Sequence, residues 1–218
     1  MRVLVFAPHN DDEVLGVGGT IAKYAREGHE VFVCEVTSWL DNKKAMLEVK
    51  EEAIQAHEIL GIKDTFFLEF PVVYLKETPT HIKNSKFREI VEDIKPNIAF
   101  IPHIGDMHVD HGETALAAMV ALRPFENPQL NAIYTYETLS ETEWNIPNSI
   151  NSFIPNVWSD ISKTFALKID AMRCFQSQLR DFPHPRSIEA IEALAKLRGS
   201  TIGAYYAESF MCVREKLI

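Results

Sequence analysis

The fold is decided by residues 3–37, which read VLVFAPHNDDEVLGVGGTIAKYAREGHEVFVCEVT. An apolar run of strand length, 3–7, comes first, and apolar residues at helical spacing follow over 15–26. Residues 30–36 form a second β-rich run. A strand, a helix and a strand of these lengths predict a right-handed βαβ unit with parallel strands.

A polar hexapeptide, Pro8–Glu13, lies at the carboxyl end of the first predicted strand. Open α/β sheets bind their ligands at this edge. One histidine and three carboxylates are costly to hold together there unless a cation or a reaction requires them. A pair such as Asp11-Asp12 also suits a turn that caps a helix, so the hexapeptide alone leaves both interpretations open.

The rest of the chain continues the alternation of strands and helices. The patterns predict helices at 43–60, 87–94, 112–122, 163–179 and 187–202, and strands at 64–70, 97–102, 130–136 and 209–214. Two segments, 71–84 and 137–155, have no clear period, and the second is longer than compact domains usually carry without a function. We therefore predict one domain, residues 1–218, with an α/β fold: a Rossmann-like three-layer sandwich around a mainly parallel sheet.

The composition argues against several classes of protein. The 218 residues carry a net charge of −9 and no run rich in lysine or arginine, which argues against a nucleic-acid partner. No apolar run approaches the ~20 residues of a membrane-spanning helix, and the first residues already belong to a strand rather than to a signal peptide. The cysteines, Cys34, Cys174 and Cys212, are far apart and odd in number, as in a reduced protein, so we expect a cytoplasmic location.

A second polar loop, His103–His111, follows the predicted strand at 97–102. In a parallel sheet this loop opens on the same edge as the hexapeptide. The two loops together offer seven imidazole and carboxylate side chains: His9, Asp11, Asp12, Asp106, His108, Asp110 and His111. Two histidines and one carboxylate without a thiolate suit zinc or iron(II) and leave positions open for water and substrate. The sequence therefore predicts a catalytic rather than a structural metal site.

The two motifs carry a resemblance. APHNDDE at residues 7–13, with His108-Val109-Asp110-His111 later in the chain, resembles the PIG-L/LmbE-like family of metal-dependent N-deacetylases that act on N-acetylglucosaminyl conjugates. Ser177-Gln178 and the stretch 207–210 also look like the bacterial members, so the resemblance spans essentially the whole chain. Asn10 stands where the family more often has proline.

The resemblance implies a reaction and a role for each polar residue. The reaction is hydrolytic removal of an N-acetyl group from a small-molecule amino-sugar conjugate, with Zn²⁺ as the metal and Fe²⁺ or another divalent ion as the alternative. Metal binding falls to His9, Asp12 and His111, the general base to Asp11, oxyanion stabilisation or protonation of the amine to His108, and orientation of the histidines to Asp110 and Asp106. A bound zinc would lower the pKa of water to roughly 7.

The substrate contacts are less defined by the sequence. Relatives often carry an arginine on the second helix that contacts substrate, and here Val49 or Lys50 occupies that place. His103 and His184 are further candidates, each with a neutral loop histidine as the simpler interpretation. The other three histidines, His29, His57 and His81, are expected to be structural or solvated.

Other functions remain open at this point. A hydrolase of another small amide on a sugar or sugar nucleotide, a non-catalytic metal- or sugar-binding module and an iron(II) oxygenase would use similar residues. Gly16–Gly19 with Glu35 suggests a dinucleotide site, but Ile21 stands at the third glycine position and the acidic hexapeptide would repel a pyrophosphate. The family resemblance also leaves a homo-oligomer open.

Overall fold

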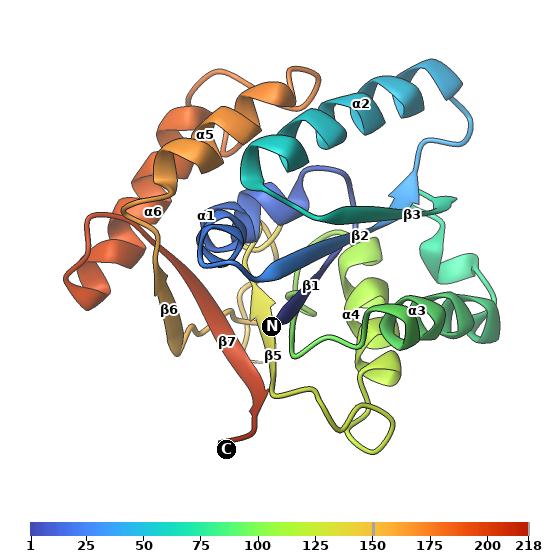
Figure 1. Cartoon of the computed structure of the whole chain (residues 1–218). Coiled ribbons are helices and arrows are strands. Elements are labelled where there is room, and N and C mark those ends of the chain that lie inside the picture. The colour runs from blue at the N-terminus through green and yellow to red at the C-terminus, as the bar shows by residue number, and fades with distance from the viewer. Residues whose placement is uncertain (150, 218) are drawn as a thin grey trace.

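The computed structural model describes residues 1–149 and 151–217, which form one mixed sheet covered by helices on both faces (Figure 1). The strands are β1 Arg2–Ala7, β2 Glu30–Ser38, β3 Asp64–Pro71, β4 Ile98–Pro102, β5 Ala132–Tyr136, β6 Val157–Asp160 and β7 Ala207–Glu215. The helices are α1 Asp12–Arg26, α2 Lys43–Leu60, α3 Thr80–Ile94, α4 Val109–Ala121, α5 Phe165–Cys174 and α6 Ile188–Ile202, with a short 3-10 helix, η1 Leu75–Glu77.

The strand order is β3-β2-β1-β4-β5-β7-β6. The first five strands are parallel, and β7 runs antiparallel to both β5 and β6. Successive side chains of β1 point to opposite faces. Val3 and Val5 pack beneath α1, α2, α5 and α6, whereas Leu4 and Phe6 pack against α3 and α4 (Figure 1). These layers confirm the predicted α/β sandwich with a mainly parallel sheet.

The glycines of α1 serve close packing. A Cβ on Gly16 would lie 2.3 Å from a ring carbon of Tyr136, and a Cβ on Gly19 would lie 2.7 Å from Ile161. The Tyr136 hydroxyl donates to the carbonyl oxygen of Phe6 at 2.8 Å, so its ring is fixed between α1 and the sheet. Only glycine lets α1 approach the sheet this closely, which accounts for the motif without a dinucleotide.

Several element boundaries differ from the prediction. Helix α1 begins at Asp12 and α4 at Val109, each three residues earlier than expected, because the polar loop residues themselves form the first helical turns. Helix α3 begins at Thr80, and η1 precedes it, within the segment expected to be irregular. The segment 137–155 has neither helix nor strand among its described residues, as predicted.

The C-terminal part differs more. Helix α5 ends at Cys174 instead of 179, because the Ser177 backbone N–H and hydroxyl are bound by the Glu52 carboxylate of α2, at 2.9 and 2.5 Å. Strand β6 was not predicted. It is a four-residue edge strand with partly exposed and polar side chains, so it lacks the apolar run that identifies a central strand.

The sheet places both polar loops at one crevice. Strand β1 lies between β2 and β4, and the chain leaves β1 for one face of the sheet and β4 for the other. Ligands of open α/β sheets bind at this switch point, beyond the carboxyl ends of the strands. Among the described residues, no helix is long and apolar enough to cross a membrane.

Candidate metal centre

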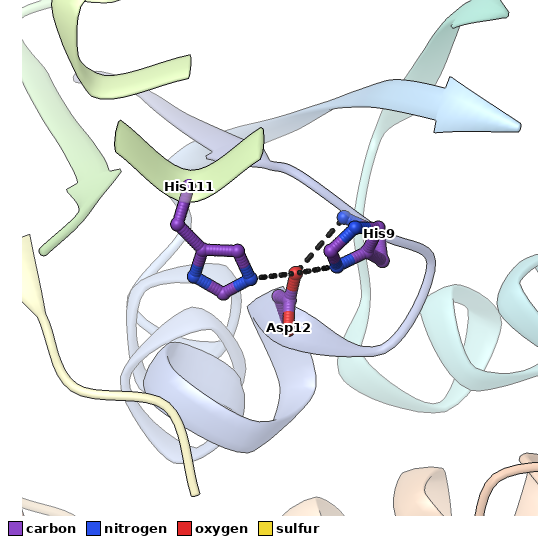
Figure 2. A group of neighbouring side chains, drawn as sticks. All are labelled: His9, Asp12 and His111. Atoms are coloured by element: carbon purple, nitrogen blue, oxygen red, sulfur yellow. Dashed lines mark hydrogen bonds and ion pairs between the residues drawn. The ribbon is translucent and has the colours of Figure 1, made fainter. Parts of the chain in front are cut away.

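His9, Asp12 and His111 converge on one point at the switch (Figure 2). His9 follows β1, Asp12 begins α1, and His111 lies in the first turn of α4. One carboxylate oxygen, Asp12 Oδ2, lies 3.1 Å from His9 Nδ1 and 3.2 Å from His111 Nε2. Asp12 and His111 are fully buried, and His9 is partly exposed. The three predicted ligands thus form one cluster, and His9 is its partly exposed member.

The turn before α1 is closed by its own hydrogen bonds. The His9 carbonyl oxygen accepts the N–H groups of Asp11 and Asp12 at 3.0 and 3.3 Å, and Asp12 Oδ2 accepts the N–H of His9 at 2.9 Å. The turn therefore keeps its shape with Asn10 in place of proline.

Two aspartates orient the histidines. Asp106 Oδ2 accepts from His111 Nδ1 at 2.8 Å, and its other oxygen accepts from the Thr142 hydroxyl at 2.6 Å. Asp110 Oδ2 accepts the N–H of Val73 at 2.7 Å and lies 3.4 Å from His9 Nε2. A carboxylate on one ring nitrogen fixes the tautomer and leaves the other nitrogen free to bind a metal. Asp106 and Asp110 thus lie beside ring nitrogens of His111 and His9, respectively.

Val73 is held in a strained backbone conformation next to this cluster. Its φ is +69°, in the left-handed region that a β-branched residue rarely adopts. The hydrogen bond from its N–H to buried Asp110 compensates part of the strain. Strain of this kind concentrates at ligand sites, and the Val73 side chain lines the hollow in front of the metal centre.

The residues present fit a divalent cation. Asp12 Oδ1, Asp110 Oδ1 and His111 Nε2 are buried, and the described residues give none of them a hydrogen bond. Burial opposes a positive charge on His9 and His111, but the neighbouring carboxylates outweigh it and raise their pKa values to about 9 and about 10. The cluster thus requires positive charge at its centre, and two nitrogens with one carboxylate are a donor set for zinc or iron.

The Asp11 carboxylate pairs with an arginine. Its side chain makes no capping hydrogen bond to α1. Instead, Asp11 Oδ2 lies 3.0 Å from the guanidinium of Arg186, which also donates to Ser140 Oγ at 2.8 Å. Burial raises the pKa of Asp11 to about 6, and the opposing charge of Arg186 limits the rise. Asp11 is therefore a buried base candidate held by one cation.

His108 faces the same space from the other loop. Its Nδ1 accepts the backbone N–H of Asp110 at 3.2 Å, so the proton of the neutral ring lies on Nε2. Burial and the positive charge of His9 lower the pKa of His108 to about 4. His108 is therefore a neutral hydrogen-bond donor at pH 7.

A hollow of about 590 Å³ opens in front of these residues and is called the inner hollow below. Its apolar wall consists of Trp39, Val49, Val72 and Val73. Its polar wall consists of His9, Asn10, Asp11, Thr37, Ser38, His108, Glu141, Gln178 and Arg186. This space is open to solvent on one side, so the hollow is a cleft rather than an enclosed cavity.

The three residues expected to contact substrate lie in different places. Lys50 pairs with Glu69 at 3.0 Å and is not among the residues that line the inner hollow, where its neighbour Val49 lies instead. His103 is buried and lies 2.9 Å from the Asn151 carbonyl oxygen, so it does not reach the inner hollow either. The structure therefore corrects both expectations. His184 lines a neighbouring hollow.

The remaining histidines, expected to be structural or solvated, do not line the inner hollow. His57 is buried and lies 3.0 Å from Glu13 Oε1 and 3.5 Å from Glu35 Oε1, while its other nitrogen meets Thr65 Oγ1 at 2.8 Å. His29 Nδ1 lies 3.3 Å from the terminal amino group. His81 is exposed.

Sequence reasoning missed Arg186, Glu141 and Trp39. Arg186 lies two residues after His184 and contacts Asp11 across 175 positions of the chain. The sequence held one usable signal, because the long irregular segment 137–155, which contains Glu141, implied a function. Arg186 and Trp39 belong to no motif of fixed spacing.

Comparisons with known proteins agree with this geometry. Residues 4–122, more than half of the chain, match the family described as PIG-L, GlcNAc-PI de-N-acetylase. A diacetylchitobiose deacetylase of Thermococcus kodakarensis is 24% identical over 97% of this chain and 83% of its own length. A probable N-acetyl-alpha-D-glucosaminyl L-malate deacetylase 2 of Bacillus cereus is 27% identical over 81% of this chain and 83% of its own.

A solved structure has the same fold. The conserved protein TT1542 of Thermus thermophilus superposes with a TM-score of 0.81 at 27% identity, covering 99% of this chain and 96% of its own. The family match begins in β1 and ends after α4, so it contains both loops of the metal centre. The chain belongs to the PIG-L family of de-N-acetylases.

Proposed function

We propose that this protein is a metal-dependent hydrolase that removes the N-acetyl group from an N-acetylglucosamine-type conjugate. The observation that carries the proposal is the cluster of His9, Asp12 and His111, whose member His9 lines an open hollow together with Asp11 and His108. A structural metal site would be enclosed by protein ligands, whereas this one faces space for a substrate.

The metal would be held by the two histidines and Asp12, and we propose Zn²⁺, with Fe²⁺ as the alternative. When bound, such a cation supplies Lewis acidity, which polarises an amide carbonyl and makes water a better nucleophile. Asp12 Oδ1 is buried and has no hydrogen-bond partner among the residues that the structure describes, which is consistent with this assignment. All further chemistry belongs to side chains of this chain.

Asp11 acts as the general base. Its carboxylate lines the inner hollow beside the metal ligands and is not used to cap α1. It takes the proton of the attacking water and later delivers it to the leaving nitrogen. Arg186 keeps Asp11 in place and favours its ionised form, which is the form that accepts a proton.

His108 stabilises the oxyanion. The backbone N–H of Asp110 occupies its Nδ1, so its Nε2–H is available to donate to developing negative charge. The apolar wall of the inner hollow, which contains Trp39 and three valines, gives the acetyl methyl group and the sugar ring an apolar surface. The two walls together orient an amphipathic substrate.

The proposal extends to the protein as a whole. We propose that residues 1–218 act as one domain on a small-molecule substrate in the cytoplasm. Three free cysteines, of which Cys34 is buried, are consistent with a reducing compartment.

The test is acetate release from N-acetylglucosamine conjugates by purified, metal-analysed protein. We expect about one divalent ion per chain and acetate release that stops with Asp11→Asn while the metal content stays the same. Binding of a sugar with full metal occupancy but no acetate release from any N-acetylated conjugate would contradict the proposal and favour a non-catalytic binding module.

A further inference from the structure

Arg186 is the one arginine or lysine among the described residues that line the inner hollow. An anionic group of a substrate would bind to it, since a guanidinium recognises phosphate and carboxylate through paired N–H groups. Most of its donors are already used: Nε donates to Ser140 Oγ at 2.8 Å, and Nη1 donates to Asp11 Oδ2 at 3.0 Å and to Gln178 Oε1 at 3.3 Å. Within the part of the chain that the structure describes, only its Nη2 makes no hydrogen bond.

Glu141 lies on the remaining side of this guanidinium. Its Oε1 is 3.6 Å from Arg186 Nη2, too far for a hydrogen bond but close enough for an ion pair. The backbone of Glu141 is fixed, because its N–H donates to the Thr138 carbonyl oxygen at 3.2 Å and its own carbonyl oxygen accepts the N–H of Met107 at 3.1 Å. Burial raises the pKa of the Glu141 carboxyl, and the positive charge of Arg186 opposes the rise. Asp11 and Glu141 thus set two carboxylates against one guanidinium.

The charges around the metal centre also disfavour an anion. The carboxylates of the metal centre and of the inner hollow belong to Asp11, Asp12, Asp106, Asp110 and Glu141. With a divalent ion bound, these groups still carry more charge than the ion and Arg186 together. Lys50 pairs with Glu69 and does not line the inner hollow, so it does not change this balance. A negative charge brought into such a site is repelled.

We propose that Glu141 is a specificity-determining residue, which compensates the charge of Arg186 and thereby makes the inner hollow favour an N-acetylated sugar whose aglycone is uncharged. In a 2-acetamido sugar the aglycone is attached to the carbon next to the one that bears the acetamido group, so a charged aglycone would lie close to the site of hydrolysis. The inference rests on the proposed function and deepens it, because it excludes conjugates with a phosphate or carboxylate beside the acetylated ring.

The experiment compares kcat/KM for acetate release from an uncharged compound, methyl N-acetylglucosaminide, and two anionic ones, carboxymethyl N-acetylglucosaminide and N-acetylglucosamine 1-phosphate. We expect the wild type to prefer the methyl glycoside roughly tenfold or more over each anionic compound. Added salt should reduce this preference, because it screens the repulsion. Assays at about pH 8 favour the ionised form of Glu141.

Glu141→Gln keeps the shape of the side chain and removes its charge. It should lower the preference for the methyl glycoside roughly tenfold by raising kcat/KM for the anionic compounds, because Arg186 Nη2 then has no carboxylate beside it. The matched control is Glu143→Gln, which removes one negative charge from the same segment, at an exposed residue that does not line the inner hollow. This control should leave the preference unchanged.

Each outcome decides a different point. Acetate release from none of the three compounds by metal-loaded protein would overturn the proposed function itself. Release from all three with no preference in the wild type would overturn the inference alone. A preference that Glu141→Gln leaves unchanged, or that falls equally in Glu143→Gln, would also overturn it, because contact with Arg186 would then not set the preference.

Discussion

Two buried clusters start from consecutive residues of α1, and they differ in what surrounds them. Asp12 joins His9 and His111 in the metal centre, whereas Glu13 joins Glu35 and His57 one layer deeper. Both sets consist of carboxylates and imidazoles whose ligand atoms lie within 4.8 Å of one another. Residue type and spacing therefore do not distinguish them.

Access and charge compensation do distinguish them. His9 of the metal centre lines the inner hollow, whereas Glu13, Glu35 and His57 are buried and do not line it. Burial, and then the charge of Glu13, raise the pKa of Glu35 well above its usual value, so Glu35 keeps a proton. A proton compensates the deeper cluster, while the metal centre can take a cation from solvent. Openness to a ligand separates a functional cluster from a structural one.

The largest expected effect separates the two clusters directly. His111→Ala should abolish metal binding and acetate release, because it removes a ligand nitrogen from the centre. His57→Ala is the matched control: a buried histidine between two carboxylates, outside the hollow. It should keep about one metal ion per chain while lowering the free energy of unfolding. Elemental analysis decides, and metal loss in His57→Ala would contradict the comparison.

The next effect concerns the base. Asp11→Asn should lower kcat by ~10²–10⁴, the usual contribution of a general base, with metal content unchanged. Steady-state kinetics and metal analysis of the same preparations measure both quantities. A variant that retains more than about a tenth of the activity would exclude Asp11 from proton transfer.

A smaller effect on metal binding is expected from Asp106, which contacts His111. Asp106→Asn weakens the acceptor that fixes His111, and it should lower metal affinity by roughly 10–100-fold. Competition with a chelator measures the affinity. Thr142→Val, which removes the hydroxyl that donates to the same carboxylate, should act in the same direction but less. Unchanged affinity in Asp106→Asn would mean that His111 is oriented by packing alone.

Substitution of Arg186, the arginine paired with Asp11, should shift a pH profile. The charge of Arg186 lowers the pKa of Asp11, so Arg186→Gln should raise that pKa. Because Asp11 must be ionised to act as a base, activity is lost as pH falls through its pKa, and the acidic limb of kcat/KM should move to higher pH. A limb that stays in place or moves to lower pH would contradict this role.

The smallest effect on activity is expected in the deeper cluster. Glu35→Gln imitates the protonated carboxyl, so acetate release should be nearly unchanged. In the wild type the folded state keeps a proton that the unfolded state releases above its ordinary pKa, so stability falls as pH rises from there toward the folded pKa. The variant should show a flatter dependence of unfolding free energy on pH in urea titrations. Equal slopes would mean that Glu35 is ionised in the folded protein.

The parts of this molecule that could be predicted are those that depend on residues close together in the sequence. Strand β1, the hexapeptide and helix α1 follow one another directly, so their pattern predicted both the βαβ unit and three of the residues at the crevice. His108–His111 followed from the same rule applied after β4. Edge strand β6 was not predicted because its four residues carry no apolar run. Its pairing with β7 is what makes it a strand.

The missed parts of the site depend on tertiary contacts. Arg186 and Asp11 are separated by 175 positions, and neither residue in the sequence predicts contact with the other. Glu141 lies in an irregular segment, where periodicity gives no orientation. Lys50 and Val49 are adjacent on α2, so the choice of which side chain faces the hollow depended on helix rotation, which a sequence pattern places only within a residue or two.

The proposed metal ligands lie in the segments that follow β1 and β4, two strands that become neighbours only in the assembled sheet. The unfolded chain has no such ligand set, so a cation that binds only the native state adds RT ln(1 + [M]/Kd) to the free energy of unfolding, about 2.7 kcal/mol at a concentration of 100 Kd. The cation would link the segments that follow β1 and β4, and this link can be removed. Depletion of the metal would then lower the melting temperature as well as the activity, and heat resistance would become a reporter of metal supply.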